Sequence, residues 1–179
     1  FKLIEAENGS YALDSSPIRT IVSGLQHLGG MENTSWDGKD DSNAVVTDGL
    51  YGIAVFAKDS CGNTNLKWTS VEVDNTSPQT VLTYPRPPDP IGNIVEVRGT
   101  ADDRNFQNYL LEATKVDQPD TWLLISSNNN PVKGDVLGTW NNTGLDGRWT
   151  LTLTTIDTVG NKNATTITID LGARKNLIK

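Results

Sequence analysis

The chain has 179 residues, a formal net charge of −7 and a sequence pI near 4.6. This acidic balance argues against nucleic-acid partners and anionic membrane surfaces, because both are bound by basic faces. One cysteine excludes an intrachain disulfide, and one histidine argues against a His-based zinc site or a Ser–His–Asp triad. No apolar run is long enough to cross a bilayer, so no membrane insertion is expected. The chain begins with Phe1 rather than Met, which predicts a processed protein or a segment of a longer one.

Short alternating runs of Thr, Val, Ile and Trp, separated by Gly, Asn, Asp and Pro, predict an all-β chain. The strands expected in the first part are residues 1–5, 17–22, 50–58 and 66–73. A turn-rich loop is expected over 36–41, and a tight turn over 60–63. Alternation along 50–58 places four side chains on one face: Tyr51, Ile53, Val55 and Ala57.

Residues 74–78 end in Pro78 and predict a linker, because proline fixes an extended bend. The proline cluster at 84–90 is expected to stiffen an edge segment, with a polyproline ligand as the alternative. The strands expected beyond it are 94–100, 107–114, 122–126, 134–140, 149–156 and 165–171, with loops at 101–105 and 128–131. Residues 173–179 are expected to form a tail.

One block of the sequence occurs twice. Residues 48–63 return as 146–161 at a constant offset of 98 residues, and both copies contain a turn, an alternating strand and an Asp-rich hairpin turn. A period of this length matches a β-sandwich domain. We therefore predict two tandem immunoglobulin-like antiparallel β-sandwiches, over residues 1–75 and 76–172.

Three motifs occur in order in the first part: W-D-G at 36–38, D-G-x-Y at 48–51 and D-x-x-G-N at 59–63. The stretch that holds them resembles the immunoglobulin-like domain of flagellar-hook capping proteins, which recurs in bacterial secreted and surface proteins. Cys61 departs from that pattern, which usually has a small residue there. The resemblance implies a bacterial extracellular setting but not the hook-capping role itself.

The second part carries V-R-G-T-A-D at 97–102, D-G-R-W at 146–149 and D-x-x-G-N at 157–161. It is similar to the bacterial Ig-like or fibronectin-III-like repeats of large extracellular proteins, and residues 73–78 resemble the joints between such repeats. These resemblances imply stalk, spacer or adhesion modules and carry over no catalytic residues.

Acidic and amide side chains are expected to gather where the linker enters the second domain. The candidate calcium ligands there are Asp74, Asn75, Asp102, Asp103, Asp157 and Asn161. Ca²⁺ takes six to eight oxygen ligands, and such a site would stiffen the joint. A second candidate site consists of Asp37, Asp40 and Asp41. The alternative is that these Asp and Asn side chains cap turns through local backbone hydrogen bonds.

Aromatic residues suggest two further roles. Tyr51 and Trp149 each follow an Asp-Gly pair by two positions, where a side-chain-to-backbone hydrogen bond is expected to lock the corner of a sandwich. The candidates for stacking on sugars are Trp36, Trp68, Trp122 and Trp140, with core or edge packing as the alternative.

Taken together, these patterns predict a non-catalytic structural, spacer or adhesion module pair of a larger bacterial surface or secreted protein. Its expected partners are other domains of the same or neighbouring surface proteins. No catalytic residue is expected, because adjacent carboxylates such as Asp40 and Asp41 point apart and cannot flank a glycosidic bond. Two alternatives remain: a carbohydrate-binding accessory module of a secreted glycan-active enzyme, and a subunit of an extracellular filament or appendage.

Overall fold

The computed structural model describes residues 3–5, 11–13, 16–24, 26, 33–88 and 90–172. All regular elements in these ranges are β-strands, and every pairing between them is antiparallel, which confirms the all-β prediction. The chain divides into two compact units, Phe1–Asn75 and Thr76–Lys179. No helix in the described part of the chain is long and apolar enough to span a membrane. The tail expected at 173–179 lies outside the described residues.

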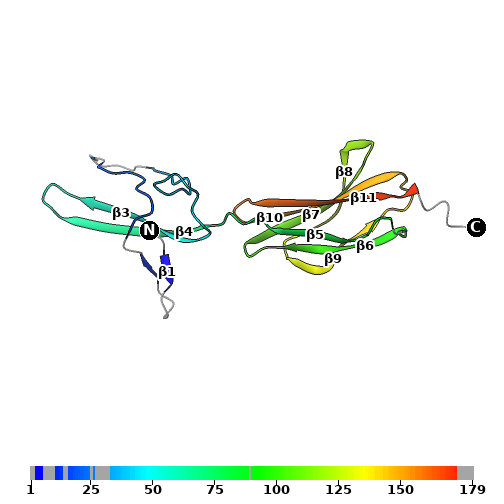
Figure 1. Ribbon diagram of the computed structural model, residues 1–179, viewed down its shortest axis with the longest axis horizontal. Helices are drawn as coiled ribbons and strands as arrows, with labels where there is room; N and C mark the ends of the chain where they lie inside the picture. The colour runs from blue at the N-terminus through cyan, green and yellow to red at the C-terminus, as the bar shows by residue number, and fades with distance from the viewer. Residues whose placement is uncertain are drawn as a thin grey trace, which may run out of the picture. The chain divides into compact units, whose positions relative to one another are not determined.

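The first unit contains two small sheets of two strands each (Figure 1). Strand β1 (Leu3–Glu5) pairs with β2 (Tyr11–Leu13), and β3 (Gly49–Lys58) pairs with β4 (Thr64–Val73). The β3–β4 register runs without a shift from Gly49↔Val73 to Lys58↔Thr64. Strands β1, β3 and β4 therefore overlap the segments predicted at 1–5, 50–58 and 66–73, of which residues 1 and 2 lie outside the described ranges. Strand β2 was not predicted.

The strand predicted at 17–22 is wrong, because this segment has no strand structure. Its backbone bonds to a loop instead: the Asp41 N–H donates to the Ile18 carbonyl at 3.0 Å, and the Thr20 N–H donates to Asp41 Oδ1 at 3.1 Å. Pro17 has no N–H to offer a sheet ladder. The loop predicted over 36–41 thus holds the segment in place.

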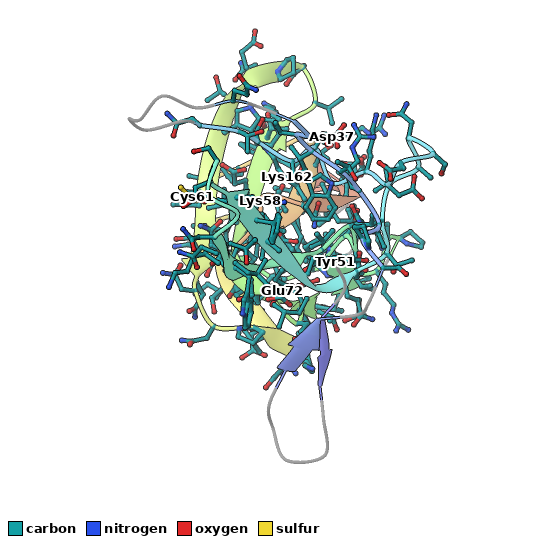
Figure 2. The ribbon with its side chains drawn as sticks, turned by 90° about the vertical axis from the view of Figure 1, so that its left-hand side faces the viewer. Asp37, Tyr51, Lys58, Cys61, Glu72 and Lys162 are labelled. Atoms are coloured by element: carbon teal, nitrogen blue, oxygen red, sulfur yellow. The ribbon has the colours of Figure 1, made fainter. Side chains whose placement is uncertain are left out.

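The β3–β4 hairpin is buried near its open end and exposed toward its tip. Tyr51 is 3% exposed, whereas Val55 is 63% and Phe56 is 66% exposed. Figure 2 shows this hairpin with the side chains of Tyr51, Lys58 and Cys61. The predicted face of alternating apolar residues therefore reaches the interior only at its Tyr51 end.

The second unit consists of two sheets that pack face to face (Figure 1). The three-stranded sheet has the order β5 (Gln79–Tyr84), β6 (Ile94–Asp102) and β9 (Val132–Asn141). The four-stranded sheet has the order β11 (Lys162–Asp170), β10 (Arg148–Asp157), β7 (Phe106–Lys115) and β8 (Gln118–Asn128). Strand β5 was not predicted, and the loop predicted at 101–105 is shorter because β6 continues to Asp102.

The core of the second unit fills the space between these sheets. Leu111, Leu151 and Leu153 point inward from alternate positions of β7 and β10 and are fully buried. The Tyr109 hydroxyl crosses between the sheets and donates to the Leu137 carbonyl at 2.6 Å. Burial of each of these leucine side chains contributes about 1.5–3 kcal/mol to the stability of the fold.

Strand β8 forms an edge of the four-stranded sheet and bulges near its start. The register shifts between Thr114 and Lys115, so that residues 119–121 leave the ladder. The Thr114 hydroxyl lies 3.0 Å from the Thr121 carbonyl oxygen and also reaches the carbonyls of Gln118 and Pro119. This buried hydroxyl therefore has a carbonyl within the bulge to which it can donate.

Candidate functional site

Two loops meet at the beginning of the second unit. The Thr158 N–H of the β10–β11 turn donates to the Asn105 carbonyl of the β6–β7 loop at 2.8 Å. A carboxylate oxygen of Asp103 and one of Asp157 lie within 4.8 Å of each other. The Asn161 amide donates to the Thr76 carbonyl at 3.2 Å. Three of the predicted calcium ligands, Asp103, Asp157 and Asn161, are thus near the start of this unit.

The buried Asp157 carboxylate organises the β10–β11 turn. Its Oδ1 accepts hydrogen bonds from the backbone N–H groups of Val159, Gly160 and Asn161 at 2.7–3.0 Å. Its Oδ2 accepts one from the Asn161 side-chain amide at 2.7 Å. Both oxygens therefore already have hydrogen-bond donors within the turn.

The other predicted members of this cluster have different surroundings. Asp102 forms an ion pair with Lys133 at 2.9 Å. Asn75 belongs to the first unit, where its backbone N–H and its amide both donate to Asp48 Oδ1, at 2.7 and 2.9 Å. Asp74 also lies in the first unit, directly after β4. Within the second unit, the acidic pair that a cation would meet is Asp103 with Asp157.

The second predicted calcium site contains Asp37, Asp40 and Asp41, and all three carboxylates accept backbone hydrogen bonds. Asp37 Oδ1 accepts one from the Lys39 N–H at 3.2 Å, and Asp41 bonds to Thr20 as described above. Asp40 Oδ1 accepts hydrogen bonds from the Ser42 hydroxyl at 2.6 Å and from the Ala44 N–H at 2.9 Å. These bonds hold the pKa of Asp40 below its ordinary value of 3.8. The three side chains do not form a group of close carboxylates among the described residues.

Among the residues that the structure describes, the same turn occurs three times, beginning at Asp40, Asp59 and Asp157. In each copy the aspartate N–H donates to the carbonyl four residues later, at 2.9, 3.0 and 3.1 Å respectively. Its Oδ1 in turn accepts from the N–H groups two and four residues later. The residue three positions after each aspartate has a positive φ. Glycine adopts this conformation freely at Gly62 and Gly160, and Asn43 adopts it with a φ of 66°.

The turn at Asp59 has a further bond from the Asn63 side-chain amide, at 2.7 Å. This bond and the backbone bond from Asn63 lower the pKa of Asp59 from its ordinary value of 3.8. The turns at Asp59 and Asp157 lie in the two copies of the sequence repeat. The two copies of the repeat therefore share a local structure as well as a sequence pattern, because both end in the same aspartate-capped hairpin.

The two aromatic corner residues bond to backbone carbonyls just before their strands. The Tyr51 hydroxyl donates to the Thr47 carbonyl at 2.7 Å, and the Trp149 indole N–H donates to the Asp146 carbonyl at 2.9 Å. The Tyr51 ring also packs against Trp36, with ring centroids 5.4 Å apart. Both rings thereby fix the chain where it enters a long strand.

The four tryptophans considered for sugar stacking fall into two classes. Trp140 is 1% exposed and packs against Trp149, and Trp36 is half-buried against Tyr51. By contrast, Trp68 on β4 and Trp122 on β8 are 50% and 51% exposed. Only these two present enough ring surface to stack on an external ligand.

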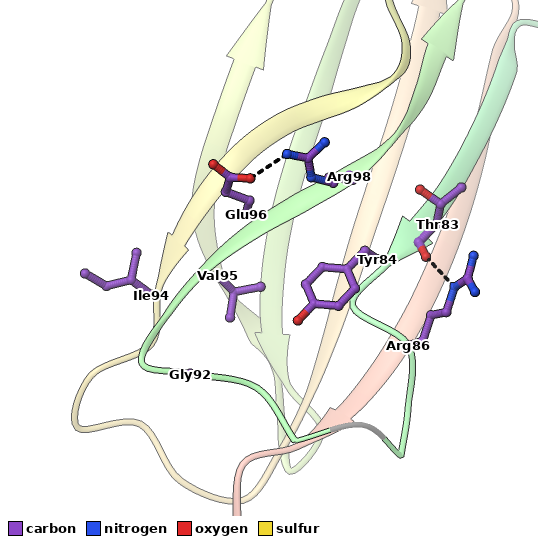
Figure 3. Close-up of a pocket in the computed structure, with 8 residues that line it drawn as sticks. All are labelled: Thr83, Tyr84, Arg86, Gly92, Ile94, Val95, Glu96 and Arg98. Carbon is purple, nitrogen blue, oxygen red and sulfur yellow. Dashed lines mark hydrogen bonds and ion pairs between the residues drawn. The ribbon is translucent and has the colours of Figure 1, made fainter.

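A shallow hollow on the three-stranded sheet was not predicted from the sequence. Figure 3 shows the residues that line it, among them Tyr84, Arg86 and Arg98. The Arg86 Nε–H donates to the Thr83 carbonyl at 3.0 Å. Arg98 pairs with Glu96 at 2.7 Å and with Asp135 at 3.4 Å. The sequence indicated that Glu96 and Arg98 lie on one face of a predicted strand. It did not indicate the hollow, because the adjoining strand β5 was missing from the prediction.

Comparison with known proteins adds no assignment. No protein-family model matches the chain, and no curated protein matches it either. The resemblances of the two units to bacterial Ig-like domains therefore rest on their sequence motifs.

Proposed function

We propose that the chain is a pair of immunoglobulin-like modules that serves as a non-catalytic spacer or adhesion segment of a bacterial surface or secreted protein. The observation that carries the proposal is the repeated aspartate-capped hairpin at Asp59 and Asp157. In both copies the aspartate carboxylate accepts backbone hydrogen bonds that hold a turn. Such use of a repeated motif supports architecture rather than a reaction as its purpose.

The strand order of the second unit supports the Ig-like part of the proposal. Its first, second and fifth strands share one sheet, and its third, sixth and seventh strands share the other. This division matches an immunoglobulin-type sandwich, apart from the fourth strand β8, which pairs with the third strand. For the first unit, the proposal is supported by the resemblance to hook-capping proteins and by the Tyr51 corner.

Calcium binding at the start of the second unit is a separate part of the proposal, supported by the pair Asp103 and Asp157. A cation there would complete its shell with carbonyl oxygens of the adjoining loops and with water. Thermal unfolding of the whole chain tests it, with calcium in excess and then with EDTA. We expect calcium to raise the melting temperature, because a ligand that binds only the folded state stabilises it by mass action.

The matched variants are Asp103→Asn and Asp102→Asn. The first removes a carboxylate from the pair, whereas the second removes a neighbouring carboxylate that is bound to Lys133. We expect the calcium shift to disappear in Asp103→Asn and to remain in Asp102→Asn. Equal melting temperatures of the unchanged chain in calcium and in EDTA would refute the calcium part and leave the spacer role intact.

Scattering over a range of protein concentrations tests the spacer role itself. A spacer predicts a monomer whose maximum dimension stays the same at every concentration and at high salt. Growth of the particles with concentration would instead favour the filament alternative. The exposed Phe56, Leu66 and Trp68 of the β3–β4 hairpin support that alternative, because a two-stranded sheet offers edges for pairing between chains.

A further inference from the structure

The outward face of the four-stranded sheet carries an ordered set of threonines. Strand β10 alternates leucine and threonine, so that Leu151 and Leu153 are fully buried while the intervening threonines point outward. Strand β11 contributes two more from its outward positions. The set, here named the threonine face, consists of Thr150, Thr152, Thr154, Thr166 and Thr168.

The strand register aligns these threonines into rows across the sheet. Thr150 lies opposite Thr168, and Thr152 lies opposite Thr166. Outward residues on one strand repeat about every 6.8 Å, and neighbouring strands are about 4.8 Å apart. The hydroxyls of Thr150 and Thr168 are 3.3 Å apart and form a hydrogen bond. The rows therefore present hydroxyl groups at regular intervals in two directions.

Three of these hydroxyl groups have unused hydrogen-bonding capacity. Within the described ranges, the side chains of Thr152, Thr154 and Thr166 make no hydrogen bond to the rest of the protein. Each hydroxyl can donate one hydrogen bond and accept two. A ligand with hydroxyl groups of its own would match this pattern without the cost of burying a charge.

The centre of this face carries fewer charges than the centre of the opposite sheet. Its two central rows run from Thr168 to Trp122 and from Thr166 to Leu124 and contain one charged residue, Glu112. The three-stranded sheet, by contrast, bears the ion-paired Glu96, Arg98 and Asp135. The remaining charged pair of the β10–β11 register on this side, Arg148 and Asp170, lies beyond the Thr150–Thr168 row. The two central rows, with a single carboxylate in a chain with a net charge of −7, therefore favour an uncharged partner.

An exposed aromatic ring lies at the border of the same face. Trp122, on the edge strand β8, shares a row with Thr150 through Thr114, and it is 51% exposed. Its neighbour Leu124 is 56% exposed. An indole ring offers an apolar surface on which the carbon face of a sugar ring can stack, while hydroxyls nearby bind the polar rim. Neither group alone selects this partner, but a hydroxyl array beside an indole ring suits both sides of a sugar.

We propose that the threonine face, together with Trp122 and Leu124, is a docking surface for a neutral polysaccharide. The inference goes beyond the spacer role, which requires no ligand. It assigns the adhesive contact to one sheet of the second unit and gives the exposed tryptophan a function.

Depletion of the full chain from solution by microcrystalline cellulose and by chitin, two neutral insoluble polysaccharides, tests the proposal. We expect retention on at least one of them, and the same retention at low and at high salt, because no ion pairs contribute. Trp122→Ala should lower the partition coefficient about tenfold, in line with the loss of an aromatic stacking contact. Thr166→Lys should also lower it, because a long charged side chain would stand on the face.

Two control variants make the same chemical changes elsewhere. Trp68→Ala removes an equally exposed tryptophan from the first unit, and Thr139→Lys adds a lysine to the outward face of the three-stranded sheet. Both should bind like the unchanged chain, and circular dichroism should show all four variants to be folded. Absence of retention on both polysaccharides overturns the proposal and leaves the spacer role standing. Equal losses in Trp122→Ala and Trp68→Ala overturn it as well, because they indicate non-specific aromatic adsorption.

Discussion

At the scale of single residues, the aspartate turns make stability depend on pH. The Asn63 side-chain amide and backbone N–H lower the pKa of Asp59 in the folded chain. A lowered pKa means that the ionised carboxylate stabilises the fold above the ordinary pKa. That contribution is lost as the pH falls from about the ordinary value, 3.8, through the lowered one. The folded chain should therefore lose stability on acidification through this window.

The variant Asn63→Ala tests this origin of the pKa. Removal of the amide takes away the largest cause of the shift, so the pKa of Asp59 should rise toward 3.8. Asp40 provides an internal control in the same sample, because its pKa is lowered by Ser42 and Ala44 and should not change. Carbon-13 NMR titration of the side-chain carboxyls measures both values. An unchanged pKa of Asp59 would show that the backbone bonds alone are sufficient.

A buried hydroxyl on β10 gives a second prediction at this scale. Thr155 is fully buried, and its hydroxyl has no hydrogen-bond partner among the described residues. Thr155→Val replaces that hydroxyl with a methyl group of similar size and should raise the free energy of unfolding by about 1 kcal/mol. Thr114→Val is the matched control: it removes a hydroxyl bonded to the Thr121 carbonyl and should lower the free energy by about 1 kcal/mol. Urea unfolding distinguishes the two, and destabilisation by Thr155→Val would contradict the argument.

At the scale of elements, β9 packs closely against β8 at Gly138. A Cβ added to Gly138 on β9 would lie 2.6 Å from Ser126 Cβ on β8 and 3.4 Å from Leu111 Cδ2. Gly138→Ala should therefore force the sheets apart locally and cost about 1–3 kcal/mol. Gly92→Ala is the control, since its nearest contact would be 3.6 Å away. Equal melting temperatures of the two variants would show that the β8 edge shifts freely.

The strands that were predicted correctly share a clear alternation. Strand β10 alternates leucine and threonine, and the two Asp-rich turns mark the ends of β3 and β10. Strand β5 was missed because its short run of apolar residues leads directly into a proline cluster. The apparent strand at 17–22 was a false prediction, because its alternation competes with backbone bonds to Asp41 that only the fold brings near.

At the scale of the whole molecule, the repeat indicated two units, and the chain divides after Asn75. Sequence alone located the candidate acids but not their surroundings: Asp103 and Asp157 lie close together, whereas Asp102 pairs with Lys133. These differences depend on where each loop lies in space, which local patterns do not encode. The threonine face was not predicted from the sequence, because it also depends on how distant segments pair. Thr150 and Thr168 are 18 residues apart in the chain, and only the strand register places them side by side.

The bulge at the start of β8 affects how readily copies of the second unit associate through this edge. An open sheet edge invites strands of neighbouring chains to add to it, which leads to aggregation. Here Pro119 lacks an N–H, and the register shift takes residues 119–121 out of a regular ladder. The first half of this edge therefore offers a poor template. Where copies of the second unit stand close together, this stretch of the sandwich therefore resists fusion with a neighbour.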